Sequence, residues 1–252
     1  MKKILFCAAM SSCFVSGLFA SNVSAQEAKP EHEVSFNLGA VSDYRYRGIS
    51  QSRLKPALQG GADYVNNTHG FYAGTWLSTI KWTKDAGGSG EIEMDLYAGK
   101  RGSITADISY DVGVLSYVYP SNGLQNVAGF ADANTTEIYG QISTGPVYAK
   151  YSHSVTNLFG FVDSKNSGYL DLGANLDMGE GYTLNLHYGR QTIKNNSSYS
   201  YNDWKLGVTK ELVGVNFSLA VIGTSTDVKY YYTPAGKFTG KTGLVLSAVK
   251  AF

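Results

Sequence analysis

The feature that most constrains the fold is a sustained alternation of apolar and polar residues along the chain. It is clearest at residues 170–178, where Leu, Leu, Ala, Leu and Met alternate with Asp, Gly, Asn and Asp. A period of two is that of an extended strand with two unlike faces. Similar segments of about ten residues recur to the C-terminus, whereas strands of soluble proteins average about five or six. The pattern predicts an all-β fold, a transmembrane antiparallel up-and-down β-barrel.

The spacing of these segments predicts about twelve strands. We place them at residues 33–46, 55–66, 70–80, 91–101, 103–118, 134–143, 146–156, 168–178, 181–191, 200–210, 213–223 and 241–252. Short turns follow the even-numbered strands, at 67–69, 102, 144–145, 179–180 and 212. Long loops follow the odd-numbered ones, at 81–90, 119–133, 157–167, 192–199 and 224–240. Because outer-membrane barrels have short periplasmic turns and longer external loops, we expect the long loops to be external.

A soluble β-sandwich, or a closed barrel with an apolar interior, is the competing fold. Aromatic residues near the expected strand ends favour the membrane, because Tyr and Trp collect where lipid chains meet headgroups. The expected girdle consists of Tyr44, Tyr46, Tyr64, Trp82, Tyr117, Tyr119, Tyr169, Tyr182, Tyr201, Trp204 and Phe252.

The first 25 residues have the character of a signal peptide. Lys2 and Lys3 precede an apolar stretch, and Val23-Ser24-Ala25 is a small-residue cleavage site, so we expect cleavage after Ala25 and a barrel over residues 26–252. An N-terminal membrane anchor is the alternative. Both cysteines of the chain precede Ala25, so the mature barrel is expected to hold no disulfide. The net charge of +1 gives no sign of a nucleic-acid partner.

The final segment alternates and ends in an aromatic residue, Phe252. Such an end is typical of chains that the barrel assembly machinery inserts, and we predict that Phe252 is the assembly signal. Lys250 shares the outward face with Phe252, where its ammonium could reach the headgroups.

Residues 41–78 carry the most specific motif. It reads Tyr-x-x-Arg-Gly-Ile-Ser-Gln at 44–51, followed by Pro-Ala-x-Gln-Gly at 56–60. This stretch resembles the TorF family, conserved bacterial porin-like proteins of poorly defined role. The resemblance implies an outer-membrane barrel with a channel role, and it implies no particular substrate and no catalytic residue.

The assigned register gives a set of side chains that should face the lumen. These pore-lining candidates are Asp43, Arg45, Arg47, Gln59, Asp63, Glu93, Asp95, Asp107, Asp111, Lys150, Asp171, His187 and Lys205, with Glu91 and Asp177 on the same faces. The charged residues of the first hairpin could form a constriction near the external mouth. Equally, they could form a salt-bridge and hydrogen-bond cluster that holds this hairpin to the wall. The acidic excess predicts a weak preference for cations, with Asp95 and Asp107 nearest mid-height.

Catalytic signals are weak. His153 is the best candidate for a lipolytic site, but Ser152 and Ser154 lie on the opposite face of the same strand, which works against a Ser-His pair. No metal-binding, phosphate-binding or dinucleotide-binding motif stands in the sequence, and no cofactor is expected. We therefore expect a non-enzymatic channel for passive diffusion of small hydrophilic solutes. A non-conducting structural or adhesive barrel is the alternative, and a lipolytic enzyme ranks below it. Expected partners are outer-membrane lipid, the barrel assembly machinery and the solutes; the sequence specifies neither the solute nor the oligomeric state.

Overall fold

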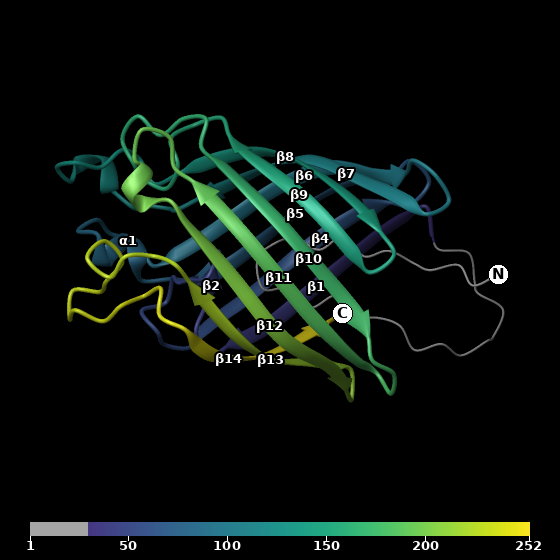
Figure 1. Cartoon of the computed structure of the whole chain (residues 1–252). Coiled ribbons are helices and arrows are strands. Elements are labelled where there is room, and N and C mark those ends of the chain that lie inside the picture. Colours follow the sequence, from purple (N-terminus) through teal and green to yellow (C-terminus); the bar gives the residue numbers. More distant parts are fainter. Residues whose placement is uncertain (1–29) are drawn as a thin grey trace.

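The structure, a computed structural model, describes residues 30–252, which form a closed barrel of twelve antiparallel strands (Figure 1). The expected signal peptide at 1–25 lies outside the described residues. The barrel strands are β1 (His32–Val41), β4 (Ala57–Asn66), β5 (Phe71–Thr79), β6 (Ile92–Ser103), β7 (Ile108–Val118), β8 (Thr135–Thr144), β9 (Val147–Ser154), β10 (Gly168–Asp177), β11 (Tyr182–Thr192), β12 (Tyr201–Leu212), β13 (Val215–Thr224) and β14 (Gly243–Ala251). Each strand pairs with its neighbours along the chain, so the up-and-down topology is confirmed.

The barrel closes between its first and last strands. β1 pairs with β14 from Asn37 opposite Ala251 to Val41 opposite Ser247. The backbone of Phe252 extends this seam, because its N–H donates to the carbonyl of Phe36 at 2.8 Å. Closure satisfies the backbone groups that the two edge strands of an open sheet would leave unpaired.

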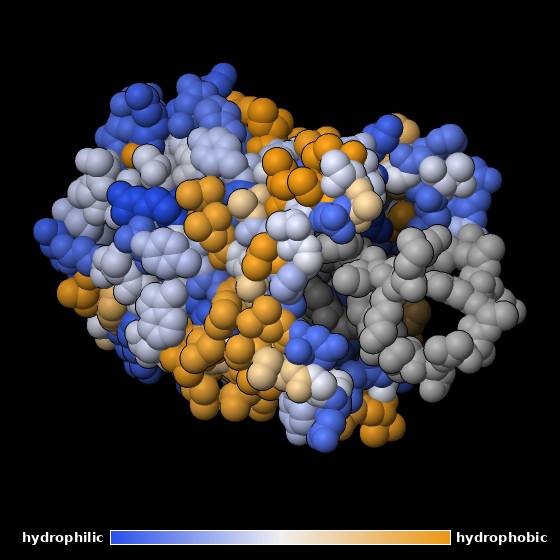
Figure 2. All heavy atoms as spheres, turned by 45° about the vertical axis from the view of Figure 1, so that its right-hand side comes forward, coloured by the Kyte–Doolittle hydropathy of each residue, from blue (hydrophilic) through white to orange (hydrophobic). Residues whose placement is uncertain are grey.

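The two faces of the barrel differ as the alternation predicts. On β1 the side chains of Val34, Phe36 and Leu38 point outward and are more than half exposed, whereas Ser35 and Asn37 between them are partly buried in the lumen. Figure 2 shows hydrophobic side chains gathered across the middle of the visible face, with hydrophilic residues toward both ends. An apolar outer band is the surface that a lipid-embedded barrel presents.

The connections differ in length at the two ends. The short turns, the start of β1 and the C-terminus share one end, the terminal rim, and the long segments share the other, the loop rim (Figure 1). The loop rim carries helix α1 (Trp82–Asp85) and the 3-10 turns η1 (Leu124–Asn126) and η2 (Ser197–Tyr199). Within residues 30–252, no helix is long and apolar enough to cross a membrane.

Three expected boundaries were wrong. The first strand ends at Val41 rather than at 46, and residues 42–56 leave the wall to form the inward loop, which contains β2 (Arg45–Tyr46) and β3 (Ile49–Ser50). The second turn occupies residues 104–107, so Gly102 belongs to β6. The last short turn is at 213–214, after Leu212.

The aromatic girdle was only partly right. Exposed aromatic residues on the outer surface include Tyr64, Tyr182, Trp204 and Phe252. Six others are buried in the interior: Tyr44, Tyr46, Tyr117, Tyr119, Tyr169 and Tyr201. Trp82 also points away from lipid, with its ring 5.0 Å from that of Tyr119. Tyr44, Tyr46, Tyr117 and Tyr119 form a core inside the barrel at the loop rim, with Trp82 packed against it, because the inward loop supplies apolar surface there.

Candidate functional site

The inward loop is a short hairpin that points into the barrel. Its ladder pairs Arg45 with Ser50 and Tyr46 with Ile49, leaving Arg47 and Gly48 as the two turn residues. Both have positive φ, 45° and 79°, the geometry of a type I′ turn. A Cβ on Gly48 would lie 2.5 Å from Thr224 Cγ2, so the tip of the hairpin touches the wall at β13 and only glycine fits there.

The tip is anchored by the guanidinium of Arg47. Its Nη2 donates to Glu137 Oε2 at 2.7 Å, and its Nη1 donates to Glu137 Oε1 at 3.1 Å and to Gln191 Oε1 at 2.6 Å. The ring of Tyr169 lies beneath the guanidinium, 4.1 Å from its Cζ. A two-pronged contact to a carboxylate and a ring beneath the guanidinium both stabilise a buried arginine. Both members of the ion pair are almost fully buried.

The base of the hairpin is held by a second arginine. Arg45 Nε donates to Asp43 Oδ2 at 2.6 Å, and Arg45 Nη1 donates to the carbonyl oxygens of Gly48 at 3.0 Å and Lys241 at 2.8 Å. Ser50 Oγ donates to the other oxygen of Asp43 at 2.5 Å. These bonds fasten the inward loop to the segment between β13 and β14.

Two tyrosines of the loop reach across the lumen to β6 and β7. Tyr44 donates its hydroxyl to Glu93 Oε1 on β6, and Tyr46 donates to the hydroxyl of Tyr117 on β7, each at 2.6 Å. Because Arg47 also bonds to Glu137 on β8 and to Gln191 on β11, the loop spans the lumen. The structure supports the second reading of the motif, an internal cluster that binds the hairpin to the wall, and this cluster also narrows the mouth.

Beyond the loop, the wall carries a polar network around His187. Its Nδ1 lies 2.8 Å from Asp171 Oδ1, and its Nε2 lies 2.6 Å from Asp203 Oδ2. Tyr169 donates its hydroxyl to the other oxygen of Asp203 at 2.9 Å. Lys150 is the direct cross-strand neighbour of Asp171. This side of the lumen thus pairs its acids with nearby cationic or hydrogen-bonding groups.

The opposite side holds carboxylates with fewer partners. Asp63 accepts from Tyr97, and Asp111 accepts from Tyr72, each at 2.5 Å. Asp95 is buried, and its Oδ1 has no hydrogen-bond partner among the described residues. Among the wall side chains of residues 30–252, the buried acids are Glu93, Asp95, Asp111, Glu137, Asp171 and Asp203, against Lys150 as the buried base. The wall therefore contributes more buried carboxyl groups than buried bases to the lumen.

The expected pore-lining residues mostly face the interior. Gln59, Asp63, Glu93, Asp95, Asp111, Lys150, Asp171, His187 and Lys205 lie on the lumenal face of the wall, and Asp43, Arg45 and Arg47 lie in the inward loop rather than on the wall. The prediction that Asp107 lines the lumen was wrong, because this residue is exposed in the turn at 104–107, at the terminal rim. Sequence reasoning missed Glu137, Gln191 and Asp203. Glu137 and Asp203 lie on the polar faces of their strands, so the same alternation would have found them.

Glu91 was also wrongly placed on an inward strand face. It is exposed just before β6 and forms ion pairs with Lys81 at 2.7 Å and Lys84 at 3.1 Å. Hydrogen bonds from Lys81 and then Lys84 lower the pKa of the Glu91 carboxyl to about 2. This pairing joins the two ends of the 80–91 segment at the loop rim.

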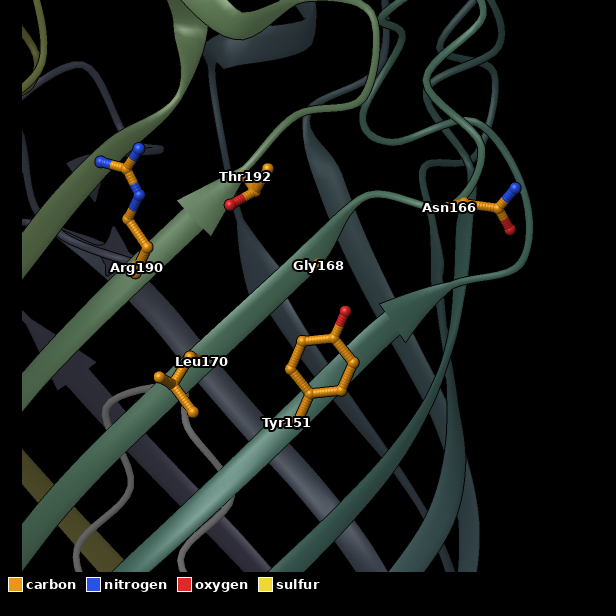
Figure 3. A pocket seen from close by; sticks show the side chains of 6 residues that line it. All are labelled: Tyr151, Asn166, Gly168, Leu170, Arg190 and Thr192. Carbon is orange, nitrogen blue, oxygen red and sulfur yellow. The ribbon is translucent and has the colours of Figure 1, made fainter.

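A shallow hollow marks the outer surface near the loop rim. Figure 3 shows its lining, Tyr151, Asn166, Gly168, Leu170, Arg190 and Thr192, drawn from β9, β10, β11 and the segment before β10. His153 Nε2 bonds to Asn166 Oδ1 at 3.1 Å, while Ser152 and Ser154 are buried on the lumenal face. The hollow is separate from the lumen, and no Ser-His pair forms in it. Within residues 30–252, no cluster of His, Cys, Asp and Glu could hold a metal ion.

A closed antiparallel barrel with an apolar outer band and a charged lumen is the architecture of outer-membrane barrels of the porin type. The chain belongs to the family described as bacterial protein of unknown function (Gcw_chp), whose model matches residues 25–252. That description does not carry the TorF name, which stays a prediction.

Solved structures share this fold. The KdgM porin aligns with a TM-score of 0.54 at 7% identity, over 86% of this chain and 99% of that one. The KdgM porin in complex with disordered oligogalacturonate aligns with a TM-score of 0.52 at 7% identity, over 87% of this chain and 98% of that one. LpxR from Salmonella typhimurium aligns with a TM-score of 0.42 at 12% identity, over 86% and 99%, which is too low to support an argument. No curated protein matches the sequence.

Proposed function

We propose that this protein is a porin-like channel of the outer membrane, exported with a cleaved signal peptide and inserted by the barrel assembly machinery. The observation that carries the proposal is the contrast between the apolar outer band and the charged lumen. A barrel with no aqueous role has no need to enclose buried carboxylates, because an ionised group taken out of water without compensation is costly. Arg47, His187 and Tyr72 compensate part of that cost, and the aqueous channel of this proposal supplies the rest. No catalytic role belongs to this proposal.

The lumen charge bears on the class of solute. One of the similar structures, the KdgM porin, is in complex with oligogalacturonate, a polyanion. The excess of buried carboxylates over buried bases in the present wall disfavours a polyanionic solute, because like charge in a confined lumen repels it. Neutral and cationic solutes of small size fit this lumen better.

The inward loop favours a second candidate function, a non-conducting structural barrel. The loop bonds to β6, β7, β8 and β11 and so crosses the lumen at the loop rim. In the channel proposal, solutes pass when this loop is displaced. In the alternative, the loop is a permanent plug.

Planar bilayer recording of the purified protein tests the two candidates. We expect small or infrequent conductance steps from the wild type. Replacing residues 43–55 by a short Gly-Ser linker should give larger and longer steps. Val213→Ser, in an exposed turn of the terminal rim, is the matched control and should behave as wild type. A folded linker variant that gives no steps would support the structural barrel instead.

A further inference from the structure

The Arg47 guanidinium lies in a cage whose hydrogen-bonding walls belong to barrel strands, while the rings of Tyr46, in the inward loop, and Phe159, between β9 and β10, lie 4.9 Å and 6.0 Å from its Cζ. Glu137 comes from β8, Tyr169 from β10 and Gln191 from β11, and together they give the guanidinium two carboxylate oxygens, an amide oxygen and an aromatic face. The cage is the complement of a planar cation with forked N–H donors. Arg47 is its occupant in this structure, and it arrives there on a loop rather than on the wall.

The cage is organised by contacts that do not involve Arg47. Gln191 Nε2 donates to the carbonyl oxygens of Gly168 at 3.1 Å and Thr192 at 3.3 Å, which turns its Oε1 toward the guanidinium. The Tyr169 hydroxyl is fixed by Asp203. The Tyr117 hydroxyl lies 3.4 Å from Glu137 Oε2. The contacts that orient Gln191 and Tyr169 come from the wall and not from the loop, and a preorganised site binds with little ordering cost.

The occupant is held under backbone strain. Arg47, Arg53 and Leu54 all have positive φ, at 45°, 61° and 58°, a conformation that residues with a Cβ rarely adopt. The hairpin itself has only two cross-strand residue pairs. Backbone bonds from Ser50 to Thr239 and from Lys81 to Gln51 also hold the loop, together with its side-chain contacts, among which Arg47 makes the buried ion pair to the wall. A solute that takes over the contacts of Arg47 removes this ion pair and weakens the hold of the wall on the loop.

We propose that the cage formed by Glu137, Tyr169 and Gln191 is a binding site for the guanidinium group of a diffusing solute, and that Arg47 is a built-in competitor for it. The inference rests on the proposed channel function and narrows its solute class to small organic cations, guanidinium compounds first. Binding of the solute and release of the inward loop are then one exchange reaction. A tethered competitor acts at an effective concentration on the order of millimolar, so the wild type binds the solute more weakly than a variant without Arg47.

The first test uses Arg47→Ala and two probes of the same shape. Methylguanidinium is the cation, and methylurea is its neutral counterpart. Titration calorimetry in detergent should show saturable binding of methylguanidinium to folded Arg47→Ala barrel and no binding of methylurea. Adding Glu137→Gln should weaken methylguanidinium binding by about tenfold or more, because the two-pronged charged contact is lost. Equal binding of both probes, or none of methylguanidinium, would overturn the proposal.

The second test needs only the wild type and so does not depend on the variant folding. Arg47 is buried and should resist trypsin while the loop is seated. Millimolar methylguanidinium should increase cleavage after Arg47, detected by mass spectrometry, and methylurea should not. Cleavage after the exposed Lys165 serves as the reference for trypsin activity. Unchanged cleavage after Arg47 across the millimolar range would contradict displacement.

These readouts are separate from conductance. If the barrel conducts and the cage binds neither probe, the channel proposal stands and the cage proposal fails. If methylguanidinium binds and no variant conducts, the cage is a binding site in a structural barrel and the channel proposal fails.

Discussion

Breaking the pair between Arg47 and Glu137 should release the inward loop without unfolding the barrel. The two side chains are 3% and 2% exposed, and removing one partner of such a buried pair costs about 3–5 kcal/mol. Since about 1.4 kcal/mol is a factor of ten, the ratio of seated to released loop should fall roughly 100- to 4000-fold in Arg47→Met or Glu137→Met. The loss falls on the loop because the barrel keeps every one of its strand pairings.

The double variant separates this reasoning from simple damage. With both charges replaced by Met, no unpaired charge remains in the interior, so the double variant should hold its loop more firmly than either single variant. Hydrogen exchange of the 42–56 amides measures the opening equilibrium in all four proteins. Losses that merely add in the double variant would refute the reasoning, as would single variants whose exchange matches the wild type.

Four other outcomes are expected. Phe252→Ala should lower the amount of heat-modifiable barrel in outer-membrane fractions far more than it lowers synthesis. A protease site inserted at Gly236, at the loop rim, should be cut on intact cells, and one at Gly145, at the terminal rim, should not; the reverse would invert the orientation. Reversal potentials under a KCl gradient should show a weak cation preference that Asp95→Asn reduces, and anion selectivity would contradict the acidic lumen. Finally, Glu91 should stay ionised as pH falls and lose its lysine pairs only near pH 2, so an NMR titration midpoint close to 4.5 would contradict that pairing.

The sequence predicted the wall well because every strand faces two different media. Lipid requires an apolar side chain at each outward position and the lumen accepts polar ones, so one physical contrast repeats along all twelve strands. The turn at 104–107 was missed because Ile104 and Ala106 continue the apolar alternation through it. A turn whose residues continue the apolar–polar alternation of the preceding strand cannot be recognised from that alternation.

The inward loop was missed for a similar reason. From Asp43 to Arg47 polar residues alternate with Tyr44 and Tyr46, which read as a continuation of the first strand. Tyrosine suits a membrane interface and a polar interior equally well, since it combines a ring with a hydroxyl. The interior position of Tyr44 and Tyr46 is decided by their contacts with Glu93 and Tyr117, which lie far along the chain. The alternation of neighbouring residues is a local pattern and does not predict such distant contacts.

The order of events during assembly follows from how far apart in sequence the loop and its partners lie. Arg47 and Glu137 are 90 residues apart, and Arg45 bonds to Lys241 across 196 residues. These partners face a common interior only after β14 has joined β1, and contacts of such separation form late because loop closure is costly. Under the channel proposal, a newly closed barrel is open until the loop docks. The rate of docking then sets how long each new molecule conducts without its loop in place.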